Sequence, residues 1–379
     1  MDNERKHIIF LARWYPHRYD PMLGLFVQRH AEAAALYNDI SVIYVHPTDC
    51  KDVPWCVSTE DETINNVRTI RIYYKKSKSK IISLFRFLRS NNLALKRLRK
   101  PDIIHVHILT RLGLIAWWHK ITRGTPYIIT EHWSRYLPGN DFSGFFRKKL
   151  TKLVVKHASA VTTVTDILAK AMQDHGLRND NYVIVPNVVD TKMFKPQPHH
   201  NEIPKIVHIS CFENKSKNIT GLIDALQILE ERNICFQCVF IGDGIDFSMV
   251  KDYSKKLKNL ENIRFTGVLE GQDVADELAS GDFLVLSSNY ETQGVVLLEA
   301  FACGLPVVST KVGGIPEIVN ESNGILVPPQ DPVKLADAMQ TMIQTYQNYD
   351  ANMLRDRIIK KFSNESVGKL LDDIYKTLN

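Results

Sequence analysis

Two glutamates separated by seven residues stand in the stretch ETQGVVLLEAFACGLPVVST at 291–310. Glu291 follows a predicted buried strand, and Glu299 lies one to two turns into the helix predicted after it. That helix begins near Gly294 and Val295, where free backbone N–H groups and the positive end of the helix dipole favour a phosphate. The two carboxylates can accept hydrogen bonds from hydroxyls. The pattern predicts a site for a phosphorylated, hydroxyl-rich ligand; two solvated glutamates at helix edges are the alternative.

Two lysines stand at an equivalent place earlier in the same half of the chain. Lys215 and Lys217 lie in ISCFENKSKNITGLIDAL (209–226), in the loop predicted between a strand and a helix. Lysine is a compact charge suited to phosphate, although two solvated loop lysines are also consistent with this pattern. The IGDG sequence at 241–244 follows another strand, and a simple turn explains it equally well.

In the first half, a glycine and a histidine follow predicted strands. Gly24 lies near a helix start in RYDPMLGLFVQRH (18–30), where it borders a phosphate or serves as a turn glycine. His132, in TEHWSRYLPG (130–139), follows a strand and is expected at the ligand-binding edge of a parallel sheet. His105 and His107 in DIIHVH are interpreted as packed within a strand.

Short apolar runs that alternate with helical patterns are expected to position these residues. The runs are too uniformly apolar for a one-sided sheet and predict strands buried on both faces. We expect strands at 7–12, 40–46, 67–74, 102–107, 127–130, 160–165, 182–186, 205–210, 236–242, 262–267, 283–288, 306–310 and 324–328, and helices at 24–37, 145–157, 220–232, 249–260, 273–280 and 295–303.

This alternation predicts an α/β protein made of two doubly wound, Rossmann-like domains that face each other across a cleft. The proline-rich stretch FKPQPHHNEIPK (194–205) is interpreted as a linker. We therefore expect an N-terminal acceptor-side domain at 1–195 and a C-terminal donor-side domain at 196–360. Residues 361–379 are expected to form a helix that packs back on the N-terminal domain.

The composition is that of a globular chain of 379 residues, with 44% hydrophobic and 24% charged residues, which excludes disordered, collagen-like and small disulfide-rich proteins. Cys235 and Cys238 form a C-x-x-C pair inside an apolar run and predict a buried strand rather than a redox or zinc site. No signal-peptide core and no apolar run near ~20 residues is present. A cytoplasmic protein, or one peripheral at the inner face of the cell membrane, is expected.

The charge is divided unevenly between the two halves. Residues 1–195 carry 31 Lys and Arg against 17 Asp and Glu, a net of +14, whereas residues 196–379 carry a net of −8. The segment Lys75–Lys100 has ten cations, no acid and interspersed apolar residues, and RKKLTKLVVKH (147–157) is a second basic cluster. This pattern favours an anionic membrane surface as partner. It does not favour nucleic acid, because no stacking or groove-reading motif accompanies the charge.

The motif ETQGVVLLEAFACGLPVVSTKVGGIPEIV (291–319) resembles the E-x7-E signature of the retaining glycosyltransferases of the GT-B fold, family four of that classification. The likeness extends through VIVPNVVDTKMF (183–194), IGDG and ENIRFTGVLE (261–270). It is looser in WYPHRYDPMLGLFVQRHAEA and in DIIHVH followed by TEH.

This resemblance implies a role for each candidate residue. Glu299 would bind the ribose and Glu291 the sugar hydroxyls of a nucleotide sugar. The backbone amides of Gly294 and Val295, with Lys217, would hold the diphosphate. His132 would lie at the reaction centre, and Gly24 would border the donor phosphates and the acceptor.

The chain also departs from the family pattern. The family often has an arginine where this chain has Cys211, which leaves open whether Lys215 replaces that charge. An aromatic residue is common where Gln293 stands, and the paired glycines of the N-terminal loop are here Leu23 and Gly24.

The implied reaction moves a hexose or N-acetylhexosamine from a nucleoside diphosphate sugar to a hydroxyl of a lipid-linked or glycan acceptor, with retained configuration, in cell-surface polysaccharide synthesis. UDP-sugars are expected before GDP-mannose. No metal is expected, and no cofactor beyond the nucleotide sugar as co-substrate. A nucleotide-sugar-binding protein without transfer activity, and a GT-B epimerase or phosphorylase, are the alternatives.

Overall fold

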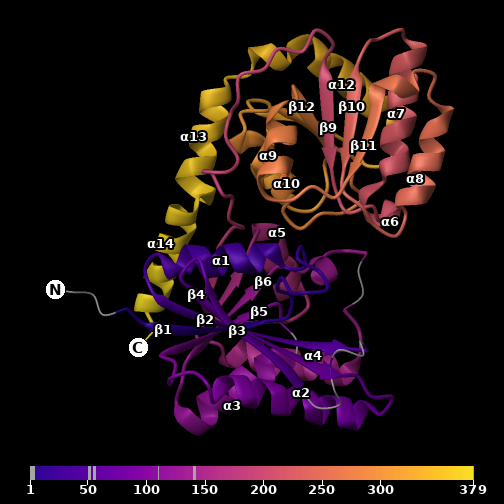
Figure 1. The fold of residues 1–379 in the computed structure, drawn as a ribbon. Helices are drawn as coiled ribbons and strands as arrows, with labels where there is room; N and C mark the ends of the chain where they lie inside the picture. The colour runs from indigo at the N-terminus through magenta and orange to yellow at the C-terminus, as the bar shows by residue number, and fades with distance from the viewer. Residues whose placement is uncertain (1–4, 50–52, 54–56, 110, 140–141, 379) are drawn as a thin grey trace. The chain divides into compact units, whose positions relative to one another are not determined.

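The computed structural model describes the whole chain except residues 1–4, 50–52, 54–56, 110, 140–141 and 379. The chain divides into two compact units. Unit 1 comprises Met1–Val188 and Asn364–Asn379, and unit 2 comprises Val189–Ser363. Each unit is built on a predominantly parallel sheet covered by helices (Figure 1), which confirms the predicted pair of α/β domains.

Unit 1 alternates strands and helices. Its elements are β1 (His7–Ala12), α1 (Leu25–Ala35), β2 (Asp39–Thr48), β3 (Val57–Ile64), β4 (Val67–Lys75), α2 (Lys80–Leu95), β5 (Ile103–His107), α3 (Arg111–Arg123), β6 (Tyr127–Glu131), the short 3-10 helix η1 (Ser134–Tyr136), α4 (Phe145–His157), β7 (Ala160–Thr163), α5 (Asp166–Asp174), β8 (Tyr182–Ile184) and α14 (Asn364–Lys376). The strand order is β3-β4-β2-β1-β5-β6-β7-β8. The order reverses direction between β1 and β5, which is where doubly wound sheets bind ligands.

Strand β3 was not predicted from the sequence. It pairs antiparallel with β4 at the edge of the sheet, and its polar residues VSTEDETI are largely solvent-facing. The turn between the two strands has Asn65 and Asn66 with positive φ values of 49° and 63°, as tight hairpins require. An exposed edge strand lacks the apolar run by which the buried strands were found.

The unit 1 sheet is buried on both faces. Along β1, Ile9 and Leu11 pack in one core with α2, α3, α4 and α5, while Ile8 and Phe10 pack in the other with α1 and α14. The two-sided burial explains why HIIFLA is uniformly apolar.

The C-terminal helix α14 belongs to unit 1, where it lies along α1 (Figure 1). A Cβ atom added to Gly368 would lie 2.2 Å from the backbone oxygen of Ala33, so the two helices approach closely there. Asn38 donates a hydrogen bond to Asp372 (3.2 Å), and the Tyr375 hydroxyl lies 2.7 Å from His105 Nδ1.

The boundary between the units falls at 188/189 rather than at the expected 195/196. Val189 and Phe194 are fully or almost fully buried in the core of unit 2. The Val189 N–H also donates to the carbonyl of Phe362 (2.8 Å). The apolar residues before the proline-rich stretch therefore belong to the domain that follows them.

Unit 2 contains a six-stranded sheet whose described pairs are all parallel. Its elements are β9 (Lys205–Ile209), α6 (Asn214–Lys217), α7 (Ile219–Glu231), β10 (Gln237–Ile241), α8 (Phe247–Tyr253), η2 (Ser254–Lys256), η3 (Leu260–Asn262), β11 (Ile263–Gly267), α9 (Gly271–Ala279), β12 (Phe283–Leu286), α10 (Val295–Ala302), β13 (Val307–Thr310), α11 (Ile315–Ile318), β14 (Gly324–Val327), α12 (Pro332–Thr345), η4 (Tyr346–Asn348) and α13 (Ala351–Phe362). The strand order is β11-β10-β9-β12-β13-β14, which reverses direction between β9 and β12.

One core of unit 2 packs α9, α10 and α13 on the sheet, and the other packs α7, α8 and α12. Cys238 is buried in β10 as predicted, but Cys235 lies before the strand and is exposed; both are free thiols. The run ICFQCVFIG therefore becomes a strand only from Gln237 onward.

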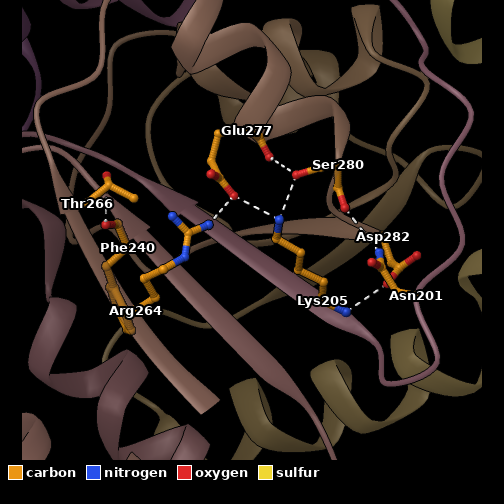
Figure 2. A network of polar contacts seen from close by, with 8 residues as sticks. All are labelled: Asn201, Lys205, Phe240, Arg264, Thr266, Glu277, Ser280 and Asp282. Carbon is orange, nitrogen blue, oxygen red and sulfur yellow. Dashed lines mark hydrogen bonds and ion pairs between the residues drawn. The ribbon is translucent and has the colours of Figure 1, made fainter. Parts of the chain in front are cut away.

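A polar network fastens the amino end of the unit 2 sheet. Figure 2 shows Glu277 between Lys205 and Arg264, at 2.8 and 2.5 Å. Asp282 accepts a hydrogen bond from the Lys205 backbone N–H (2.7 Å). Although burial favours the neutral acid, the hydrogen bonds from Arg264 and Lys205 hold the pKa of Glu277 below its ordinary value. These charges lie at the end of β9 opposite to the loops described below, so we assign them to stability.

Within the described part of the chain, no helix is both long enough and apolar enough to cross a lipid bilayer.

The close approach at Gly368 reverses the expected effect of an alanine. In an exposed helix, Gly→Ala stabilises by about 0.5–1 kcal/mol. Here Gly368→Ala is expected to destabilise unit 1 by about 1–3 kcal/mol, because its Cβ meets the backbone of α1. The thermal unfolding midpoint measures this, with the exposed Asp373→Ala on the same helix as control. A raised midpoint for Gly368→Ala would show that α14 does not dock in this way.

Candidate functional site

Three loops of unit 2 meet at the carboxyl ends of β9, β10 and β12. The first carries Lys217, which lies in the one-turn helix α6 rather than in an open loop as expected. The second is IGDG after β10, and the third carries Glu291 after β12. Because β10, β9 and β12 are neighbours in the sheet, the fold brings together segments separated by up to about 80 residues.

Side chains of the third loop fasten α6 in place. The Ser287 hydroxyl donates to the carbonyl oxygens of Lys217 (2.9 Å) and Asn218 (3.1 Å). The backbone N–H of Asn289 donates to the Ser216 carbonyl (2.8 Å), and its side-chain amide donates to the Lys215 carbonyl (2.9 Å). The two candidate regions are therefore one structural unit.

Lys217 and Glu291 form an ion pair at the centre of this arrangement. Their side chains are 17% and 13% exposed, and the Ser288 hydroxyl donates to the same Glu291 oxygen (3.0 Å). Burial alone would lower the pKa of Lys217, but the Glu291 carboxylate outweighs it and the pKa is raised. Lys217 therefore carries its positive charge at neutral pH.

Glycines allow the Glu291 loop to pack tightly. A Cβ atom on Gly313 would lie 1.7 Å from the Glu291 carbonyl oxygen, and its φ is +49°. Gly294, with φ +75°, is the left-handed residue directly before α10. Helix α10 then begins at Val295, as predicted, and Glu299 is buried within it.

The IGDG sequence does more than make a turn. A Cβ atom on Gly242 would lie 2.0 Å from the Ser210 carbonyl oxygen, so this loop packs directly on the loop after β9. Asp246 extends the contact by accepting the backbone N–H of Asn214 (2.7 Å) at the start of α6. The sequence alone gave no sign of this contact.

The two lysines differ in their environments. Lys215 is exposed, in contrast to Lys217. Cys211, which stands where the family often has arginine, is exposed and close enough to Lys217 for its charge to influence that lysine. Replacement of the arginine charge by Lys215 stays a prediction.

In unit 1, Gly24 lies at the start of α1 with φ +69°. Its ideal Cβ would lie 2.3 Å from the Trp14 carbonyl carbon. Only glycine lets the helix start pack against the loop after β1, which is the structural interpretation of this residue. Its contact with a ligand stays a prediction.

His132 lies directly after β6 and is buried. Its Nδ1 lies 3.1 Å from Asn187 Oδ1, and its Nε2 lies 3.3 Å from Nδ1 of His107. Burial holds the pKa of His132 well below its usual value, so the ring is neutral at pH 7. His105 and His107 are fully buried, which confirms that they pack within the strand. A substrate contact by a His132 ring nitrogen would require exchange of one of these hydrogen bonds.

Three histidines of unit 1 form a group that could hold a metal ion. One ring nitrogen each of His30, His107 and His132 lies within 4.8 Å of the others. His30 Nε2 donates to the Pro186 carbonyl (2.9 Å), which leaves the lone pair of Nδ1 without a described partner, as is Nε2 of His107. Imidazole nitrogens suit zinc and related ions. The expectation of a metal-free reaction stays a prediction.

Glu131 is a site residue that sequence reasoning missed. It is fully buried, and its carboxylate accepts the backbone N–H groups of Leu109 (3.0 Å), His132 (2.9 Å) and Trp133 (2.9 Å). Burial raises its pKa to about 7, although these hydrogen bonds oppose the shift. Glu131 thereby joins the loops after β5 and β6. Its position at the end of a strand was the one available signal.

Two family models match this chain and together cover most of it. "Glycosyltransferase Family 4" matches residues 32–193, and "Glycosyl transferases group 1" matches residues 203–345. The chain belongs to the family 4-type glycosyltransferases of the GT-B fold.

Named relatives agree with this assignment. The glycosyltransferase is 28% identical over 291 residues to N-acetyl-alpha-D-glucosaminyl L-malate synthase of Bacillus anthracis, a match that covers 72% of this chain and 74% of that protein. The matches to two further relatives cover only 50% and 62% of their lengths.

Solved structures show the same fold at low identity. Sucrose-phosphate synthase from Thermosynechococcus elongatus superposes with a TM-score of 0.79 at 20% identity, over 99% of both chains. Anabaena HepE in complex with UDP gives 0.74 at 18% identity, over 98% of this glycosyltransferase and 100% of HepE.

Beneath the unit 2 loops, His208 provides a pH-dependent contribution to stability. It is fully buried, with Nδ1 2.9 Å from the Val285 carbonyl and Nε2 2.8 Å from the Ser210 hydroxyl. Burial lowers its pKa from 6.5 to about 4. Below pH 6.5 the unfolded chain binds this proton more readily than the folded chain does, so stability is lost as pH falls from 6.5 towards 4.

We expect this histidine to contribute about 3 kcal/mol to the loss by pH 4. Thermal unfolding midpoints at pH 7.5, 6 and 5 measure the effect. His208→Gln should have a shallower decline than the wild type, and the exposed His200→Gln should follow the wild type. Parallel declines for all three proteins would contradict the assignment.

Proposed function

We propose that this glycosyltransferase moves a sugar from a UDP-sugar to an acceptor hydroxyl with retention of anomeric configuration. The observation that carries the proposal is the grouping of Lys217, Glu291 and the start of α10 at the carboxyl edge of the unit 2 sheet. It combines a cation, a carboxylate and free helix N–H groups where such sheets bind nucleotides.

The donor is proposed to be a nucleotide sugar with a diphosphate. Lys217 and the amides at Gly294 and Val295 would hold the diphosphate, Glu299 the ribose and Glu291 the sugar hydroxyls. Lys215 would add a second cation at the rim. HepE, which shares the fold, was solved with UDP, and this supports uracil as the base. The name of the Bacillus anthracis relative refers to an N-acetylglucosaminyl group, so N-acetylhexosamine and hexose are both to be tested.

In the proposed reaction, the bond between the anomeric carbon and the diphosphate oxygen breaks on the face where the acceptor oxygen bonds. The departing diphosphate takes the acceptor proton. Lys217 and the α10 amides would stabilise the charge that develops on the leaving group. These groups can neutralise a diphosphate by themselves, which is why we propose a reaction without metal.

His132 is proposed to line the reaction centre as a neutral ring. Its hydrogen bonds to His107 and Asn187 fix its orientation, and Glu131 holds the backbone on either side of it. Gly24 would leave space for the donor phosphates near the same loops.

The acceptor side is proposed to work at the inner face of a membrane. Helix α2 exposes Ile81 and Phe85 at 80% and 63%, and α4 exposes Phe145 and Phe146 at 74% and 78%. Both helices also carry exposed lysines and arginines. A basic surface with exposed aromatic residues suits an anionic lipid layer and a lipid-linked acceptor for polysaccharide synthesis.

Donor-site variants test the transfer reaction. Lys217→Ala and Glu291→Gln are expected to lower transfer from UDP-sugars by about 100-fold or more, because each removes a group aimed at the leaving diphosphate or the sugar. The exposed Lys251→Ala is the matched control. Activity is followed as UDP release, and product configuration by NMR.

In the same series, UDP should raise the thermal midpoint of the wild type more than GDP does, since a bound ligand stabilises by mass action. Undiminished turnover in both variants, with folded protein, would refute the donor site. Stabilisation by GDP alone would refute the choice of UDP.

Membrane contact is tested by flotation with vesicles. The wild type is expected to float with phosphatidylglycerol vesicles but not with phosphatidylcholine vesicles, and less at high salt, because each cation near an anionic surface contributes about 1 kcal/mol. Lys80→Glu with Arg89→Glu on α2 should abolish flotation. Lys251→Glu with Lys258→Glu, the same charge change in unit 2, should not. Salt-insensitive binding to both vesicle types would overturn the electrostatic account.

A further inference from the structure

A cavity of about 500 Å³ opens at the carboxyl edge of the unit 1 sheet. Its floor is formed where strands end, by Ala12 after β1, Leu109 after β5 and Trp133 after β6. Helices α2, α3 and α4, which lie on one face of this sheet (Figure 1), supply the walls. The volume is within the range of small-molecule sites.

Four arginines line this cavity: Arg13, Arg111, Arg135 and Arg147. None of its described lining residues is acidic. Partial loss of solvent, together with the neighbouring charges of Arg111 and Arg135, lowers the pKa of Arg13. Three guanidinium groups are therefore close enough to repel one another, an arrangement that an anion in the cavity would relieve.

Arg135 is held ready without a carboxylate partner. Its guanidinium lies 3.7 Å from the centroid of the Trp133 ring, and its buried Nε has no hydrogen-bond partner among the described residues. The charge of Glu131 acts on the same region, but its oxygens already accept three backbone N–H groups. Planar, fixed guanidinium groups of this kind suit phosphate oxygens.

The opposite wall of the cavity is apolar. Phe87, Leu112, Leu150 and Val154 face it. Leu114 lines both this cavity and a second groove of about 700 Å³ between α2 and α3, which continues past Leu95, Ile115 and Trp118. A ligand with its anion at the arginines thus has an apolar path leading away from it along α2.

We propose that this cavity binds the acceptor through a diphosphate that joins a sugar to a long apolar chain. The diphosphate would lie among Arg13, Arg111 and Arg135, and the first part of the chain would follow Leu112 and Leu114 into the groove. A diphosphate diester carries two negative charges, and the arginine cluster matches it better than it matches the single charge of a phospholipid phosphate. Trp133 and Arg135 follow His132 directly in the chain, so the sugar hydroxyl would be presented beside that residue. The proposal rests on the proposed function and names its acceptor class.

Binding of farnesyl diphosphate to the full chain tests this, measured by isothermal titration calorimetry with UDP present in saturating amount so that the donor site is occupied. Farnesyl diphosphate is expected to bind at least tenfold more tightly than inorganic diphosphate or farnesol. Arg13→Gln and Arg111→Gln should each weaken it at least tenfold, and the exposed Arg178→Gln should not. Leu114→Asn should weaken farnesyl diphosphate while leaving inorganic diphosphate unchanged.

Equal affinity for inorganic and farnesyl diphosphate would overturn the apolar half of the proposal. Unchanged affinity in both arginine variants would overturn the anion half. Equal competition by phosphatidylglycerol micelles would assign the cavity to a phospholipid instead. UDP binding, measured in the same variants, separates the outcomes: if UDP fails to bind the wild type, the proposed donor fails, whereas loss of farnesyl diphosphate binding alone concerns only this cavity.

Discussion

The end of a parallel strand leaves backbone groups that the sheet no longer satisfies, and buried groups of this kind must find other partners. In both units, polar side chains from neighbouring loops provide them. Glu131 accepts three N–H groups from the loops after β5 and β6, and Ser287 and Asn289 donate to carbonyl oxygens of α6. These bonds fix the loops rigidly, so the candidate residues that the loops carry inherit defined positions.

The parts of the fold that the sequence predicts are those whose burial leaves a local pattern. HIIFLA becomes β1 residue for residue because both faces of that strand are covered. The polar edge strand β3 was missed, since its position depends on the Asn65–Asn66 turn and on pairing with β4. The domain boundary moved because Val189 and Phe194 reveal their partner only in three dimensions.

The candidate site shows the same division. The pattern around Glu291 and Glu299 and the strand-loop-helix around Lys217 could be found by spacing, because each lies at a predicted strand end. Nothing local distinguishes Lys217 from Lys215; the choice follows from the ion pair with Glu291, 74 residues away. Glu131 was missed for a similar reason, since one of the amides it binds belongs to Leu109, 22 residues earlier.

The two proposed anion sites differ in how their cations are balanced. Lys217 has a carboxylate partner, so an arriving diphosphate must compete with Glu291, which moderates affinity and favours release of the spent nucleotide after each transfer. Arg13, Arg111 and Arg135 have no such described partner, and entry of an anion relieves their mutual repulsion as well as forming new bonds. Strong binding then falls to the acceptor, whose apolar chain keeps it in a membrane, while the freely diffusing donor is held more loosely and exchanged.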